Sequence, residues 1–111
     1  MSITEAGRAL AGRLPYEHVA GRAAEVVPAR WAEVDGFVLF LATGAAVRII
    51  APLLGDKATD PAVVCVDEAG RFAVALCGGH GGGANALART VGTALGATPV
   101  VTTATDAVGL P

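Results

Sequence analysis

The chain has 111 residues, enough for one domain with its own hydrophobic core but too few for two. Hydrophobic residues make up 53% and charged residues 16%, which excludes an intrinsically disordered chain, and the net charge of −2 without a Lys/Arg cluster argues against nucleic-acid binding. The apolar run 36–47 is too short to span a bilayer, and Glu5 interrupts the stretch where a secretory signal would be apolar. We therefore expect a cytoplasmic protein without membrane contact.

The first third of the chain predicts short elements. In chain order they are a short strand at 1–3 or a trimmed N-terminus, a helix at 5–14, a weak strand at 16–20 and a helix at 28–34. Thr4 is a good cap for the first helix, and Pro15 ends it. Pro28 is expected at the first position of the second helix, with Trp31 as a packing anchor on its inner face.

The rest of the chain alternates more clearly between strands and helices. The expected elements are a strand at 36–42, a helix at 43–55, strands at 62–66 and 72–77, a helix at 84–95 and a strand at 99–103. The run 36–42 is apolar without alternation, as in a central strand that is covered on both faces. Val47, Ile50 and Leu54 are expected on the inner face of the following helix, with Gly55 as its C-cap.

Residues 67–71 read as the loop of a β-hairpin. Pairing across this loop puts Cys65 opposite 72–74 and Cys77 opposite the beginning of the other strand. A disulfide is therefore excluded, and both cysteines are expected to be buried thiols. The same pairing brings Asp60 close to the residues that follow Cys77.

Alternating strands and helices predict an α/β fold in three layers, α/β/α, with a mostly parallel sheet and one β-hairpin. Ligands of such sheets bind outside the carboxyl ends of the strands. Polar or glycine-rich segments follow three predicted strands, at Thr43–Gly44, Gly78–Asn85 and Thr102–Asp106, and the hairpin pairing adds Lys57–Asp60. We expect these four segments to meet at one rim of the sheet.

The segment Gly78–Asn85, GGHGGGAN, combines five glycines with an imidazole and an amide. Between a strand and a helix, such a loop exposes backbone N–H groups to an anionic or polar ligand. It matches neither the Walker lysine loop nor the dinucleotide fingerprint. His80 is either a general acid or base at neutral pH or a residue that fills a tight turn. No further ligands stand at metal-binding spacing, so no metal site is predicted.

Five motifs occur in a characteristic order: TGAAVRII, DKATDPAVV, DEAG, GGHGGGAN and TTATD. Together they resemble the N-terminal domain of cobalamin biosynthesis protein G, over Gly36 to Asp106. Gly78 stands where that family usually has serine, and Gly81 replaces a bulkier residue. The chain ends shortly after TTATD, whereas family members continue into a middle region and a C-terminal domain, so we expect that this C-terminal domain is absent from residues 1–111.

The resemblance implies a role in cobalamin (vitamin B12) biosynthesis, in which the δ-lactone of cobalt-precorrin-5A is opened hydrolytically and acetaldehyde is released. The substrate is then a corrinoid or tetrapyrrole that carries its own cobalt, so no further cofactor is expected. A similar domain also occurs fused to a precorrin methyltransferase. A C-terminal or methyltransferase partner domain is therefore expected, and a homo-oligomer is left open.

Lactone opening needs a base for water and a donor for the oxyanion. The candidates for catalysis are His80, Asn85 and Asp106. The candidates for substrate binding are Thr43, Gly44, Arg48, Lys57, Asp60, Gly79, Gly82, Gly83, Thr102 and Thr103. Arg48 or Lys57 would hold carboxylate arms of the substrate, although Arg48 equally fits a solvated outer helix face.

Two other functions compete with hydrolysis. One is a non-catalytic corrinoid-binding or docking domain of a larger protein, which would bind a corrinoid without turnover. The other is a phosphate- or nucleotide-binding α/β module, which the missing lysine after the glycine loop disfavours.

Overall fold

The computed structural model describes residues 1–4, 14–56, 58–79 and 83–102. Its middle layer is a six-stranded sheet in the order β2-β1-β3-β4-β5-β6. The strands are β1 (Ser2–Thr4), β2 (His18–Ala20), β3 (Gly36–Phe40), β4 (Ala62–Val66), β5 (Phe72–Cys77) and β6 (Thr98–Val100). The helices are α2 (Ala23–Arg30), α3 (Thr43–Ile50) and α4 (Gly83–Leu95), and the 3-10 turn η1 (Ala51–Leu53) follows α3. Most of the helix predicted at 5–14 lies outside the described residues.

The sheet is mostly parallel, as predicted, and β5 reverses its direction. β1 pairs in parallel with β2 and β3, and β3 pairs in parallel with β4. β4 and β5 form the antiparallel hairpin, and β6 runs parallel to β5. The last two strands therefore point opposite to the first four.

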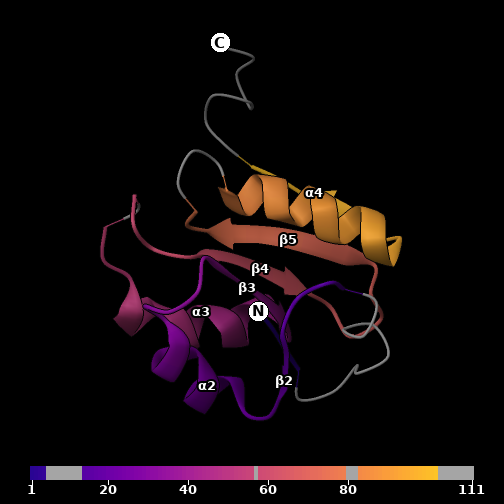
Figure 1. Ribbon diagram of the computed structural model, residues 1–111. Helices are drawn as coiled ribbons and strands as arrows, with labels where there is room; N and C mark the ends of the chain where they lie inside the picture. The colour runs from indigo at the N-terminus through magenta and orange to yellow at the C-terminus, as the bar shows by residue number, and fades with distance from the viewer. Residues whose placement is uncertain (5–13, 57, 80–82, 103–111) are drawn as a thin grey trace.

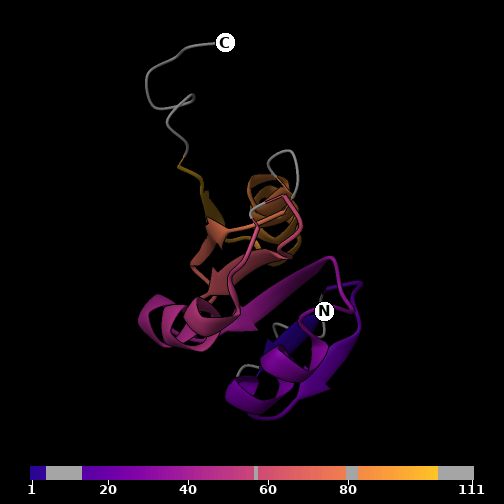
Figure 2. The ribbon, with the colours of Figure 1, turned by 90° about the vertical axis from the view of Figure 1, so that its left-hand side faces the viewer.

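The helices cover both faces of the sheet, which confirms the three-layer prediction. In Figures 1 and 2, α4 lies on one side of the sheet and α2 and α3 lie on the other. Along β3 the side chains alternate between the two faces, as the pleat of a strand requires. Val38 and Phe40 pack with α4, whereas Phe37 and Leu39 pack with α2 and α3. The continuous apolar run of β3 is explained by this burial on both faces.

The boundaries predicted for the helix that contains Pro28 were wrong. Helix α2 begins at Ala23, and Pro28 lies inside it instead of opening it. A proline there removes the hydrogen bond to the carbonyl four residues earlier, that of Ala24. Ala24 is exposed, so water can hydrate that carbonyl, while buried Ala23 and Val27 hold the helix on the sheet. Burial thus outweighs the local signal of the proline.

Trp31 follows α2 and is a packing residue, as predicted. Its ring stacks on the ring of buried Phe37, with 5.8 Å between the centroids and 15° between the planes. This contact fixes the end of α2 against the beginning of β3.

The inner face predicted for α3 was right for Ile50 and wrong for Val47 and Leu54. Ala46 and Ile50 are buried, whereas Val47 is 48% exposed and Leu54 is 45% exposed. Arg48 marks the solvent side of α3, and Ala46 and Ile50, each two positions away from it, lie on the opposite side of the helix. The lone arginine therefore indicates the buried face better than the spacing of the large apolar residues does.

The hairpin pairs as the sequence predicts. Cys65 lies opposite Val74 and Val63 lies opposite Cys77, and both cysteines are free. A register shift between Val63 and Val64 marks a bulge near the end of β5. Cys65 is buried and Cys77 is half-buried.

Asp67 organises the loop of the hairpin. Its carboxylate accepts hydrogen bonds from the N–H groups of Arg71 at 2.8 Å and Phe72 at 2.7 Å. Its carbonyl accepts one from Gly70, whose φ of +69° needs a glycine. The hydrogen bond from the N–H of Phe72 lowers the pKa of Asp67, and the bond from Arg71 adds to this effect, while desolvation opposes it.

Helix α4 matches its prediction closely. Its buried residues include Ala84, Ala88, Val91 and Leu95, one stripe at helical spacing. Gly96 follows with a φ of +70°, the left-handed conformation that ends many helices.

Within the described part of the chain, no helix is long and apolar enough to cross a membrane.

Phe37 carries much of the core on the α2 and α3 side. Phe37→Ala is expected to lower the free energy of unfolding by about 3–5 kcal/mol, because the cavity and the lost burial both cost stability. Phe72 is 42% exposed and serves as the matched control, with an expected loss of less than about 1 kcal/mol. Urea denaturation of both variants measures the difference, and equal losses would contradict the packing described here.

Asp67 is expected to make stability depend on pH. Its pKa is lowered in the folded chain, so its charge stabilises the fold above the unfolded pKa of about 4 and loses that effect as pH falls through the folded pKa. The free energy of unfolding of the wild type should exceed that of Asp67→Asn at pH 7, and the gap should close in acid. A gap that widens as pH falls would be the wrong sign.

Candidate functional site

A groove of about 660 Å³ lies where β3 and β4 begin and β5 ends. Gly36 and Ala62, at the first residues of β3 and β4, line it together with Gly79 after β5. Gly83 and Leu87 of α4 form one side. The other lining residues are Met1, Tyr16, Val34, Asp35, Val38, Ala58, Thr59, Asp60 and Pro61.

The turn after β5 depends on two glycines. Gly78 and Gly79 both have a φ of +79°, the left-handed region that glycine alone enters easily. A Cβ on Gly78 would lie 2.0 Å from the carbonyl oxygen of Pro61, so the serine usual in the resembling family would need another turn geometry. A Cβ on Gly79 would lie 2.7 Å from the nitrogen of Ala84. The end of β5 is thereby pressed against the beginning of β4.

The hairpin pairing brings Asp60 to the glycine turn, as predicted. The N–H of Gly79 donates to the carbonyl of Asp60 at 3.1 Å. The Asp60 carboxylate accepts the N–H of Gly55 at 3.0 and 3.2 Å, and its own N–H donates to the carbonyl of Asp56 at 2.8 Å. Asp60 therefore shapes the connector 55–60, and its charge lies at the edge of the groove.

Three backbone N–H groups around the turn are already engaged. Gly79 donates to Asp60, Gly83 donates to the carbonyl of Gly79 at 3.3 Å, and Ala84 donates to the carbonyl of Gly78 at 3.3 Å. These donors are not free to cradle a phosphate, which weakens the nucleotide-binding alternative. His80 and Gly82 lie outside the described residues.

Asn85 and Thr102 share a second, smaller hollow. It has about 200 Å³ and is also lined by Cys77 and Gly78, so it adjoins the glycine turn. Burial, and after it the charge of Asp60, raises the pKa of the Cys77 thiol. Burial raises the pKa of Cys65 to about 12. Both thiols are therefore protonated at neutral pH and are poor nucleophiles.

The prediction that four segments meet at one rim was wrong for Thr43–Gly44. Gly36 pairs with Ala62, and Val63 pairs with Cys77, so β3 begins where β5 ends. Thr43 follows the carboxyl end of β3 and therefore lies at the ends of the strands that are opposite to the groove. The reversal of β5 is the cause, because the carboxyl ends of β3 and β5 point in opposite directions.

Five of the other candidates line one of the two spaces. Asp60, Gly79 and Gly83 line the groove, and Asn85 and Thr102 line the hollow beside it. Arg48 is exposed on α3 and lines neither space. Lys57, His80, Gly82, Thr103 and Asp106 lie outside the described residues, so their predicted roles, like that of Arg48, stay predictions.

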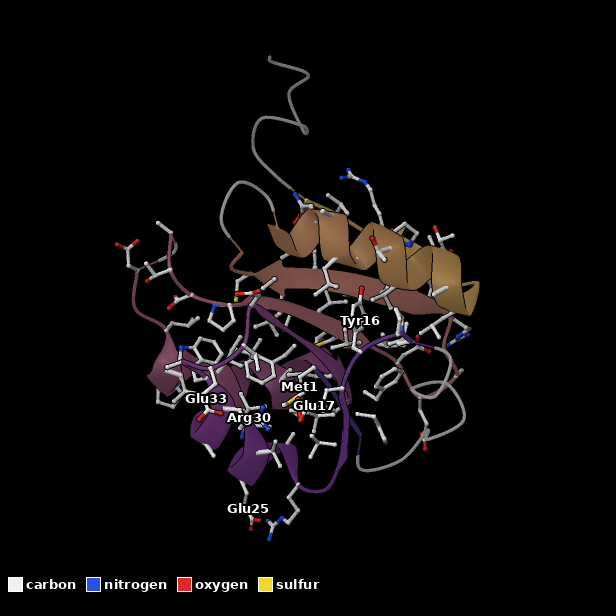
Figure 3. All side chains as sticks on the ribbon, in the orientation of Figure 1. Met1, Tyr16, Glu17, Glu25, Arg30 and Glu33 are labelled. Atoms are coloured by element: carbon white, nitrogen blue, oxygen red, sulfur yellow. The ribbon has the colours of Figure 1, made fainter. Side chains whose placement is uncertain are left out.

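Sequence reasoning missed Tyr16 and Asp35. Tyr16 is half-buried, packs against the core cluster that contains α4, and lies below α4 in Figure 3. Asp35 precedes β3, and its carbonyl accepts the N–H of Ala62 at 2.9 Å. The reversal of β5 could have pointed to Asp35, because it places the beginning of β3 beside the glycine turn. No pattern in the sequence pointed to Tyr16.

Charges gather where Met1 meets the groove. The Met1 ammonium donates to the carbonyl of Gly36 at 2.9 Å, and burial lowers its pKa. Below it, Arg30 binds Glu17 through two 3.4 Å hydrogen bonds and also pairs with Glu33 (Figure 3). The pair with Glu17 joins α2 to the segment before β2. Over the described ranges, no group of three His, Cys, Asp or Glu residues could hold a metal ion.

The fold is that of an α/β domain in which the reversed strand β5 is followed by a glycine turn and then by α4. The groove beside this turn is large enough for a ligand. The family model described as cobalamin synthesis G N-terminal matches residues 25–106, well over half of the chain. The chain belongs to this family, and the resemblance found in its motifs is confirmed.

Known relatives agree with the family. A cobalt-precorrin-5A hydrolase from Salmonella typhimurium is 60% identical over 65 residues, which are 59% of this chain and 18% of that protein. One from Priestia megaterium is 47% identical over 81 residues, which are 73% of this chain and 22% of that protein. This chain thus spans about a fifth of the length of these curated relatives.

A solved structure has the same fold. The crystal structure of a protein described as a cobalamin biosynthesis protein G homolog from Sulfolobus solfataricus matches with a TM-score of 0.77 and 31% identity. The match covers 91% of this chain and 35% of that one.

The turn formed by Gly78 and Gly79 is expected to be required for the stability of the fold. Gly79→Ala should lower the free energy of unfolding by at least about 2 kcal/mol, through left-handed strain and contact with Ala84. Gly55→Ala is the matched control, because its Cβ would lie 3.7 Å from Asp60 Oδ1, an ordinary contact, and should change stability by less than about 1 kcal/mol. The urea denaturation midpoints of the two variants measure these losses. A Gly79→Ala variant that is as stable as the wild type would refute this turn geometry.

Proposed function

We propose that this domain takes part in cobalamin biosynthesis, in the hydrolytic opening of the cobalt-precorrin-5A δ-lactone with release of acetaldehyde. The observation that carries the proposal is the 60% identity to a cobalt-precorrin-5A hydrolase, together with a family match that spans the connector, the glycine turn and α4. The cobalt belongs to the substrate, and the proposal needs no further cofactor. The free cysteines support a cytoplasmic setting.

The residues predicted for catalysis have the side-chain chemistry that lactone opening needs. Water must lose a proton as it attacks the ester carbonyl, and the carbonyl oxygen then carries negative charge. We assign the base to His80 or Asp106. We assign stabilisation of the oxyanion to the Asn85 amide, which is half-buried in the first turn of α4 and can donate a hydrogen bond.

A second candidate is a corrinoid-binding or docking domain whose chemistry lies elsewhere in a larger protein. The charge of the groove favours it, since the described lining residues bring two carboxylates, Asp35 and Asp60, and only the Met1 ammonium as a cation, which is bonded to the Gly36 carbonyl. Carboxylate arms of a corrinoid would then be held by Lys57 or by a partner domain, such as a C-terminal or methyltransferase domain. Corrinoid binding by this chain without acetaldehyde release would support this candidate.

The two functions are separated by measuring acetaldehyde. We expect His80→Ala and Asn85→Ala each to lower acetaldehyde release from the lactone by about 100-fold or more, as the loss of a catalytic base or an oxyanion donor does. The assay uses this chain alone and with the remaining domains of a hydrolase relative. Thr90→Ala, at an exposed position of α4, is the control and should release acetaldehyde like the wild type. Undiminished release by both site variants would remove these residues from the mechanism.

A further inference from the structure

On one side of the sheet, β5 and β6 carry apolar side chains that no described helix covers. The pairing of the strands fixes this side, because Cys65 packs with α2 and α3 and pairs with Val74, which pairs in turn with Val100. Phe72 lies two residues before Val74 and pairs with Thr98, so these residues share the same face. We call the surface formed by Phe72, Val74, Thr98 and Val100 the open face.

The open face lies outside both parts of the core. The alternate residues of β5, Ala73 and Ala75, pack in the cluster that contains α4. Among the described residues, neither core cluster includes Phe72, Val74 or Val100. Phe72 is 42% exposed, and the two valines are half-buried. Figure 2 shows α2 and α3 on this side of the sheet and no described helix over β5 and β6.

The ring of Phe72 has a polar cover that an apolar partner can displace. The Arg71 guanidinium lies over this ring, 5.8 Å from its centroid. The Arg71 side chain is 74% exposed, and its guanidinium lies 3.6 Å from the Asp67 carboxylate. A cation–π contact at such an exposed site is weak, and a long arginine side chain keeps its charge in water while its stem shifts. The partner would therefore take the ring out of water and leave Arg71 at the rim.

A helix is the element that fits the open face. On the other side of the sheet, the 13-residue helix α4 packs its stripe of buried residues on β5 and its neighbours. On the side of the open face, α2 packs on β1, and the covered part ends at β4, where Val63 and Cys65 are buried. Layered α/β sheets are covered by helices on both faces. A further helix over β5 and β6 would extend the layer that α2 and α3 begin.

The longer relatives indicate where such a helix comes from. The family is described as N-terminal, and the matched stretches are 18% and 22% of the two hydrolase relatives, so most of each relative follows this domain. β6 is the edge strand beside the open face, and the family match runs from there to residue 106. Consecutive elements of a chain are usually adjacent in space. The region that follows β6 in the relatives therefore begins beside the open face.

We propose that the open face is the docking surface for an amphipathic helix of the region that follows this domain in its longer relatives. The apolar stripe of that helix packs on Phe72, Val74 and Val100, and its polar side faces solvent. This docking does not depend on which reaction the groove serves.

Docking is tested by calorimetric titration of this chain with the remaining region of the relative that is 47% identical, expressed separately. Phe72→Asp and Val74→Asp should each weaken binding at least tenfold, because a carboxylate would be buried against an apolar stripe. Ala86→Asp adds the same charge at an exposed position of α4, on the other side of the sheet, and should bind like the wild type. Phe72→Asp should unfold at nearly the wild-type temperature, which separates its binding loss from a folding loss.

A second measurement places both parts in one chain. Thr98→Cys should react with a maleimide in this chain alone, and at least tenfold more slowly when the chain is joined through its C-terminus to the same region of the relative. Thr90→Cys, exposed on α4, is the control and should react equally in both forms. Cys65 and Cys77 add little background, because burial raises the pKa of both thiols and the thiolate is the reactive form.

The outcomes separate this occupant from the others. Protection of Thr98→Cys in the joined chain supports the proposal even where the separate parts bind weakly, because the linkage raises the effective concentration. Equal reactivity of Thr98→Cys in both forms, or wild-type binding by folded Phe72→Asp and Val74→Asp, would overturn it. A wild type that binds no separate region, but forms a dimer that Phe72→Asp dissociates, would overturn it in favour of a second copy of this chain.

Discussion

The close contact between the end of β5 and the beginning of β4 determines where this domain can hold a ligand. Gly78 and Gly79 lie in the left-handed region, and Pro61 and Ala84 leave no room for a side chain on them. The bond from Gly79 to the Asp60 carbonyl closes the same contact. The chain then enters α4 directly above the first residues of β3 and β4, and the groove is the space that remains.

The reversal of β5 also changes the usual rule for ligand sites in α/β proteins. The unit β5-α4-β6 obeys it, because the glycine turn and Thr102 follow the carboxyl ends of its strands. For β1, β3 and β4 the same rim is the amino end. The groove therefore combines two kinds of strand end, which explains why Asp35 and Gly36 line it and Thr43 does not.

The sequence predicted those features that depend on long, regular patterns. The apolar run of β3, the stripe of α4 and the pairing of Cys65 with Val74 follow from burial on two faces, helical spacing and loop length. The buried side of α3 was predicted only in part, because the spacing of the large apolar residues points to Val47, whereas the buried face is the one opposite Arg48. Tyr16 could not be predicted either, because only the fold brings it to α4. The hairpin implies that β5 runs opposite to β3 and β4. This direction places the beginning of β3, and with it Asp35, beside the glycine turn.

The glycines of GGHGGGAN, which look alike in the sequence, act differently in the structure. Gly78 and Gly79 are required by backbone geometry, since any Cβ would meet Pro61 or Ala84. Gly83 is under no such constraint from the described neighbours and faces the groove. Among the described residues, nothing therefore forbids a side chain at position 83. The motif thus contains two glycines that the turn requires and one at the groove that it does not require, and the two kinds can be separated by substitution.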